Sequence, residues 1–110
     1  MADSTVGRLL DDKRPVRWVC DVAASHFGDV DLAALVLAQG RDFDLTDRHP
    51  PCRISGCPGV VRFEDRTSQW PRALTALTDG DDAWWTHNED RRRTLNALGW
   101  RCVMGEWVAP

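Results

Sequence analysis

Residues 49–63 read HPPCRISGCPGVVRF and hold two of the four cysteines, Cys52 and Cys57, with four residues between them. A Pro-Gly pair and a strand-like run follow the second thiol. Gly56 or Gly59 permits the tight turn that would present both thiolates on one small loop. Structural zinc takes four nitrogen or sulfur ligands, and its ligand pairs are typically separated by roughly two to four residues. The stretch therefore predicts half of a structural zinc site.

The cellular compartment bears on what the thiols can do. The first residues, MADSTVGRLLDDKR, contain no apolar segment of signal-peptide length, and no apolar run approaches the ~18 residues that span a bilayer. We therefore expect a reducing cytoplasm, where four cysteines favour a metal site over structural disulfides. The alternative is that Cys52 and Cys57 stay reduced and pack as small apolar side chains.

A zinc site needs a second ligand pair from elsewhere in the chain. The candidates are a cysteine or histidine from the set Cys20, His26, His49, His87 and Cys102. His49 lies three residues before Cys52 and competes with His26 for one position. Cys102 falls in a predicted C-terminal hairpin, and we expect it to be a residue of the protein core and not a ligand. If four protein side chains close the site, the zinc is structural and its binding is coupled to folding.

The region Trp18–Phe63 resembles small zinc-ribbon-like proteins of alphaproteobacteria and their phages. The matching pieces are WVC, SH, DLAALVLAQG, RDFDL and CRISGCPGVVRF, in that order. The resemblance implies a structural Zn²⁺ and no established activity. It implies four ligands, namely Cys20, His26, Cys52 and Cys57. The first pair departs from the family pattern as Cys-x5-His, and the second is wider than Cys-x-x-Cys.

The remaining patterns predict a small single domain of the α+β class. Val16–Cys20 and residues 59–65 read as strands, and residues 100–110 read as a β-hairpin that turns near Met104 and Gly105. Apolar spacing and capping residues predict short helices over residues 29–40, 70–80 and 86–99, the first of them buried on more than one side. We expect residues 1–14 to be a flexible segment and residues 15–110 to form the zinc-stabilised domain.

Charge and motifs exclude several functions. The 110 residues include 14 basic and 17 acidic side chains, a net charge of −3, whereas general DNA-binding proteins are usually basic. The chain has no glycine-rich phosphate loop, no Cys-x-x-Cys redox pair, no His-Glu-x-x-His and no serine-nucleophile motif. The sequence therefore predicts a protein that is not an enzyme.

The segment DDAWWTHNEDRRR, residues 81–93, concentrates side chains that serve in binding. Tryptophan and arginine are enriched at the centres of protein interfaces. The predicted partner-binding residues are Trp84, Trp85, Arg91, Arg92 and Arg93. The simpler alternative is that one tryptophan packs inside while the arginines pair with neighbouring acids.

These observations together predict a non-catalytic, zinc-stabilised module that binds a protein partner and no membrane. Its small size and acidity suit an inhibitor of a bacterial defence system, encoded by a phage or mobile element and similar in role to an anti-CRISPR protein. The alternative is a small nucleic-acid-binding zinc protein acting in regulation.

Overall fold

The computed structural model describes residues 4–110. Three helices and six strands follow one another along the chain: α1 (Val6–Asp11), β1 (Val16–Cys20), β2 (Phe27–Asp29), α2 (Leu32–Gln39), β3 (Val61–Asp65), β4 (Arg72–Ala73), α3 (Asp82–Ala97), β5 (Arg101–Val103) and β6 (Glu106–Val108). The predicted α+β class is confirmed, with antiparallel strands and a C-terminal hairpin.

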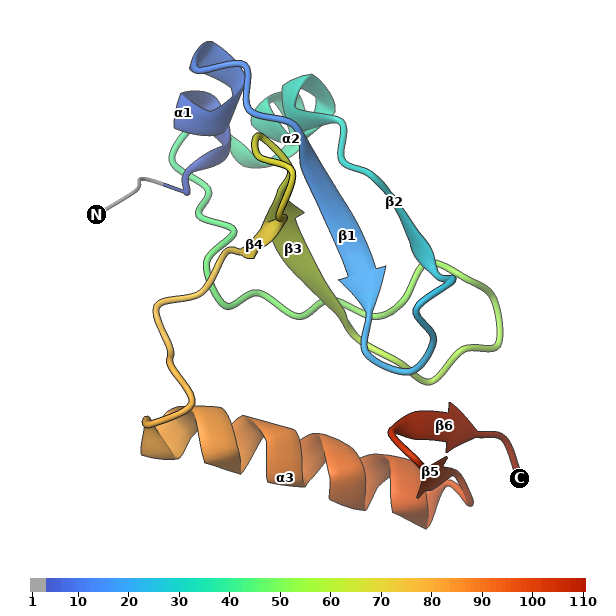
Figure 1. Ribbon diagram of the computed structural model, residues 1–110. Helices are drawn as coiled ribbons and strands as arrows, with labels where there is room; N and C mark the ends of the chain where they lie inside the picture. The colour runs from blue at the N-terminus through green and yellow to red at the C-terminus, as the bar shows by residue number, and fades with distance from the viewer. Residues whose placement is uncertain (1–3) are drawn as a thin grey trace.

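Four strands form one antiparallel sheet in the order β2-β1-β3-β4. The central pairing sets Trp18 opposite Phe63 and Cys20 opposite Val61. Since alternate residues of a strand face opposite sides of a sheet, Val16, Trp18 and Cys20 share one face. Figure 1 shows α1 and α2 at one end of this sheet and α3 beyond its other end.

The main apolar core lies between α1, α2 and the sheet. Its buried members are Val6, Leu9, Val16, Leu32, Leu45 and Leu74, a set that we call the N-terminal core. Val6 and Leu9 come from α1, which falls within the segment that we predicted as flexible. Of that segment, residues 1–3 lie outside the described residues. From residue 4 onward the prediction differs from the structure, because the apolar residues of VGRLL supply part of the core.

Helix α2 begins and ends where its sequence predicts. The Asp31 side chain caps it by accepting a hydrogen bond from the Ala34 N–H, and Gly40 ends it with a φ of 87°. The expectation that it is buried on more than one side is wrong. Leu32 is buried, whereas Leu37 is 89% exposed. The helix therefore packs through one face only.

Residues 70–80 do not form the predicted helix. Arg72 and Ala73 pair with β3 as strand β4, and the Leu74 N–H continues this ladder by donating to the Phe63 carbonyl. Leu74 is thereby placed in the N-terminal core. A tertiary partner thus overrides the local helix signal, and the chain then runs on to α3.

Helix α3 starts four residues earlier than the predicted residue 86. Asp82 lies in its first turn, where a carboxylate is favoured by the helix dipole. Beyond its end, Gly99 has a φ of 93°, and the hairpin of β5 and β6 follows. Met104 and Gly105 both have positive φ, at 51° and 83°, as a two-residue turn of the predicted hairpin requires.

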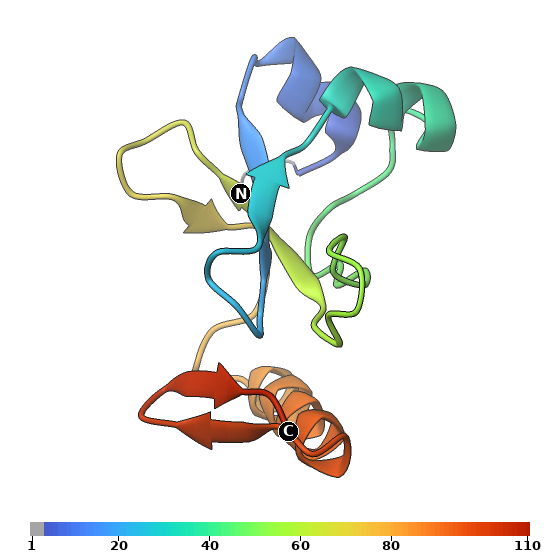
Figure 2. The same cartoon turned by 90° about the vertical axis from the view of Figure 1, so that its right-hand side faces the viewer.

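Helix α3 and the hairpin lie together beyond one end of the sheet, as two perpendicular views agree (Figures 1 and 2). We call residues 82–108 the C-terminal unit. A second buried cluster lies where this unit meets the rest of the protein. It contains Cys20, Val22 and Leu95, with Cys52, Cys57, Trp100 and Trp107 packed against it. Three of the four predicted zinc ligands thus lie at this junction.

Candidate metal centre

Two segments of the chain present the predicted ligands, the turn between β1 and β2 and the loop before β3. Cys20 ends β1, and His26 closes the turn that leads into β2. The two residues are joined by a backbone hydrogen bond of 2.9 Å from the Cys20 N–H to the His26 carbonyl. Cys52 and Cys57 lie in the loop before β3, which is closed by a 2.9 Å bond from the Cys52 N–H to the Gly59 carbonyl. The antiparallel pairing of β1 with its two neighbours therefore brings both halves together.

The ligand atoms of Cys20, His26, Cys52 and Cys57 all lie within 4.8 Å of one another, and we call these four residues the metal cluster. The sulfurs of Cys20 and Cys57 are 3.6 Å apart, and the Cys52 sulfur is 3.7 Å from His26 Nδ1. Zinc bonds of about 2.3 Å to sulfur and 2.0 Å to nitrogen at tetrahedral angles require separations of roughly 3.8 and 3.6 Å. These two separations are close to those of a tetrahedral site, so the cluster could hold a metal ion.

Backbone amides and a glycine shape the two thiol turns. The Val22 N–H donates to the Cys20 sulfur at 3.3 Å, and the Gly59 N–H donates to the Cys57 sulfur at 3.4 Å. Such bonds favour the thiolate form that binds metal. A Cβ atom at Gly59 would lie 2.4 Å from the Cys20 sulfur, so only glycine fits at this position. Gly56, with a φ of 80°, supplies the tight turn between the two cysteines.

The surroundings of the Cys57 thiol favour its neutral form unless a cation binds beside it. Burial raises the pKa of Cys57 to about 11, the Cys20 and Cys52 thiols act in the same direction, and the Gly59 N–H opposes them. Three thiolates gathered at this spacing repel one another unless a positive charge lies between them. A divalent metal supplies that charge, because a coordinating thiol is deprotonated by the ion.

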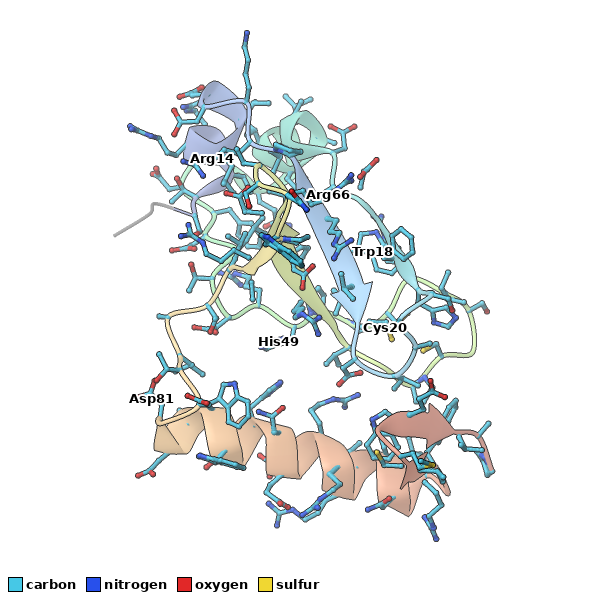
Figure 3. All side chains as sticks on the ribbon, in the orientation of Figure 1. Arg14, Trp18, Cys20, His49, Arg66 and Asp81 are labelled. Carbon is cyan, nitrogen blue, oxygen red and sulfur yellow. The ribbon has the colours of Figure 1, made fainter. Side chains whose placement is uncertain are left out.

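The other candidate ligands lie elsewhere. His49 uses Nδ1 in a 3.1 Å contact with the Val61 carbonyl, and its ring stacks on that of His87 at 4.2 Å between centroids. Figure 3 places His49 between the sheet and α3, whereas Cys20 lies at the end of β1. Cys102 is exposed on β5 and is not in the core as expected. The structure therefore groups His26 with Cys20, Cys52 and Cys57. His49 and Cys102 lie outside this group.

The C-terminal unit is tied to the metal cluster by an ion pair that the sequence did not reveal. Arg91 Nε donates to Asp21 Oδ2 at 2.6 Å, and the same guanidinium donates to the Pro58 carbonyl at 3.2 Å. Asp21 also accepts the Val60 N–H at 3.0 Å. Because Asp21 follows Cys20 and Pro58 follows Cys57, this one arginine holds both thiol turns. Its side chain is only 17% exposed.

One face of α3 carries all of these contacts. Trp84, His87, Arg91 and Leu95 recur at helical spacing and are the partly or fully buried residues of that stripe. Leu95 is buried against Cys20 and Val22. This spacing was readable in the sequence, but its mixture of polar and apolar residues gives no clear hydrophobic stripe, so the docking face was missed.

The predicted partner-binding residues therefore divide between two faces. Trp84 and Arg91 face the rest of the protein, whereas Trp85 is 57% exposed. Arg92 and Arg93 are exposed and pair with Glu89 and Asp90 of the preceding turn.

Burial, followed by the charges of His49 and Arg91, lowers the pKa of His87, while Asp21 and Asp90 oppose this shift.

No protein-family model, no curated protein and no solved structure matches this chain. The resemblance to zinc-ribbon-like proteins therefore stays a prediction. Within residues 4–110, none of the helices has both the length and the apolar character that crossing a membrane requires.

Proposed function

We propose that the protein is a non-catalytic binding module whose fold is held by one structural Zn²⁺. The observation that carries this proposal is the convergence of four ligand atoms within 4.8 Å, contributed by three cysteines and one histidine. Protein side chains then fill all four positions of a tetrahedral zinc. No position is left open for a water or substrate, which a catalytic zinc needs.

The metal would serve the module by fixing the surface on which α3 docks. Asp21 and Pro58 each adjoin a ligand cysteine, and both bind Arg91 of α3. A bound ion would hold these two turns at a fixed separation. The zinc would thereby orient the C-terminal unit, whose Trp85, Leu98, Val103, Met104 and Val108 are exposed large apolar side chains.

This exposed set supports a protein as the partner. Arg91 is occupied by Asp21, and Arg92 and Arg93 are paired with acids of their own helix. Few cations of α3 thus remain for phosphates, while apolar and aromatic anchors suit a protein interface. The specific role that we propose is a cytoplasmic inhibitor of a bacterial defence system, encoded by a phage or mobile element. Small size and net acidity support it.

Metal analysis tests the zinc proposal. Purified wild-type protein is expected to carry about one zinc per chain, and Cys52→Ser and His26→Gln are expected to lower that content. The matched controls are Cys102→Ser and His49→Gln, which remove a thiol and an imidazole outside the metal cluster. The proposal would be contradicted by less than about half a zinc per wild-type chain, or by control variants that lose as much zinc as Cys52→Ser and His26→Gln.

Partner capture from a bacterial host lysate tests the binding surface. We expect a specific protein to be retained by the wild type and lost with Trp85→Ser. Trp70→Ser is the control, since Trp70 is also exposed, at 78%, but lies outside the C-terminal unit. Binding to DNA or RNA with a steep salt dependence, unaffected by Trp85→Ser, would instead support the nucleic-acid alternative.

A further inference from the structure

A cleft of about 330 Å³ lies between α3 and the edge of the sheet. Its walls come from Asp21, from residues 47–49, 60–63 and 73–75 with Leu77, and from α3. This volume is at the lower end of the range for small-molecule sites, which often lie at the junction of two structural units. None of the four metal-cluster residues lines it. The cleft is therefore a separate feature of the protein.

The two acidic residues in the wall are already engaged by protein donors. Asp21 accepts hydrogen bonds from Arg91 and from the Val60 N–H. Asp47 accepts them from the Thr75 hydroxyl and from the Ala76 N–H. Arg91 offsets the charge of Asp21, whereas Asp47 is held by neutral donors and keeps its charge. The oxygens of both carboxylates are thus already used as acceptors within the protein.

By contrast, several nitrogen donors in the wall make no hydrogen bond within the described part of the protein. Arg48 uses Nε on the Asp44 carbonyl, and Arg62 uses Nε on Glu64. Among residues 4–110 the terminal nitrogens of both arginines make no hydrogen bond, and the Arg48 guanidinium lies over the Phe43 ring at 4.2 Å from its centroid. His49 uses only Nδ1, and the His87 ring makes no hydrogen bond within the described chain. The terminal nitrogens of two arginines and at least one ring nitrogen of each of two histidines therefore make no hydrogen bond at this cleft within the described residues.

The apolar side chains of the wall include Phe63, Leu74, Leu77 and Trp84. We infer that the cleft binds a small organic anion, whose carboxylate or phosphate group lies among His49, His87 and Arg48 and whose flat apolar body packs beside Trp84. Arginine and imidazolium donors form strong charge-assisted bonds to such oxyanions. This inference goes beyond the proposed function, because it assigns a ligand site that neither the zinc nor a protein partner requires.

The surroundings of His87 add a pH dependence. His49 and Arg91 face it with positive or chargeable groups, and Asp21 and Asp90 face it with negative ones. A bound anion would favour the protonated imidazole against its cationic neighbours. Because the pKa of His87 lies below its ordinary value of 6.5, binding is expected to tighten as the pH falls toward and below that value.

The test uses the zinc-loaded full chain and three probes: phenyl phosphate, benzoate and the uncharged benzyl alcohol. NMR signals of the histidine Cε1–H groups and of the tryptophan indole N–H groups report binding. We expect saturable shifts with at least one anion and none with benzyl alcohol. The pH dependence is read with benzoate, whose charge stays constant over this pH range, because the second pKa of a phosphate monoester is about 6. The anion that binds more tightly identifies the head group.

Variants locate the site. Arg48→Gln is expected to weaken binding by about tenfold or more, the loss of one charge-assisted hydrogen bond. Arg93→Gln, on the outward side of α3, should bind as the wild type does. His87→Gln should reduce the pH dependence and leave the part that His49 contributes, with its fold checked by the amide spectrum. The inference is overturned if neither anion saturates, if benzyl alcohol shifts the same signals equally, or if Arg48→Gln and Arg93→Gln bind alike.

Discussion

The N-terminal core and the C-terminal unit are held in contrasting ways. The first is an apolar cluster in which Val6, Leu9 and Leu45 are almost completely buried. The second meets the rest of the protein through an ion pair, a histidine stack and a small apolar cluster beside the metal cluster, to which it contributes Leu95, Trp100 and Trp107. Apolar burial is non-directional and needs only area, whereas ion pairs and metal bonds need fixed geometry. The C-terminal unit therefore depends on the thiol turns as the N-terminal core does not.

Removal of the metal is expected to have the largest effect, and to destabilise the C-terminal unit more than the N-terminal core. Structural zinc binding in small domains is worth about 10 kcal/mol or more. A chelator should therefore release α3 and the hairpin first. Amide hydrogen exchange should show early loss of protection at α3 and later loss in β1 and α1. Uniform loss of protection along the whole chain would show that the two regions are not separable.

The N-terminal core can be broken independently by Leu9→Ala. Deleting a fully buried leucine side chain typically costs about 2–5 kcal/mol. Denaturant unfolding of the zinc-loaded protein measures this loss. Leu37→Ala is the matched control, since Leu37 is 89% exposed, and it should change the free energy of unfolding by less than about 0.5 kcal/mol. Similar costs for the two variants would contradict the packing of α2 and α1 described above.

Loss of the ion pair should have a smaller, local effect. Arg91→Gln leaves Asp21 without its charged partner, and we expect a cost of about 1–3 kcal/mol. The loss should appear as faster hydrogen exchange in α3, with the strands unaffected. Arg93→Gln removes an exposed pair with Asp90 and should cost less than about 1 kcal/mol. If the two variants are equal, Arg91 does not fasten the helix.

Acidification should have the smallest effect. Burial, then His49 and Arg91, lowers the pKa of His87 in the folded protein below its ordinary value of 6.5. The unfolded chain therefore binds more protons, and stability declines as the pH falls through that ordinary value. The slope of unfolding free energy between pH 7.5 and 5.5, measured with zinc retained, should flatten in His87→Gln. An unchanged slope would exclude this histidine as its source.

The failures of prediction share a physical cause. Residues 70–80 carry good local helix signals, with Pro71 placed for a first turn, yet the chain gains more by pairing Arg72 and Ala73 with β3. Likewise, VGRLL is too short to stand alone as a helix. It becomes α1 because Val6 and Leu9 pack against α2 and the sheet. In both places a distant partner, which local patterns cannot show, decided the outcome.

The sequence by itself determined the α2 caps, the strands that flank the thiols, the hairpin turn and the identity of the thiol turn residues. These features follow from backbone preferences and side-chain chemistry within a few positions. Only the tertiary structure placed His26 with the cysteines and His49 on His87, and only it joined Arg91 to Asp21 across 70 positions. Ligand sets and ion pairs are fixed by which turns meet in space, and strand pairing brings those turns together.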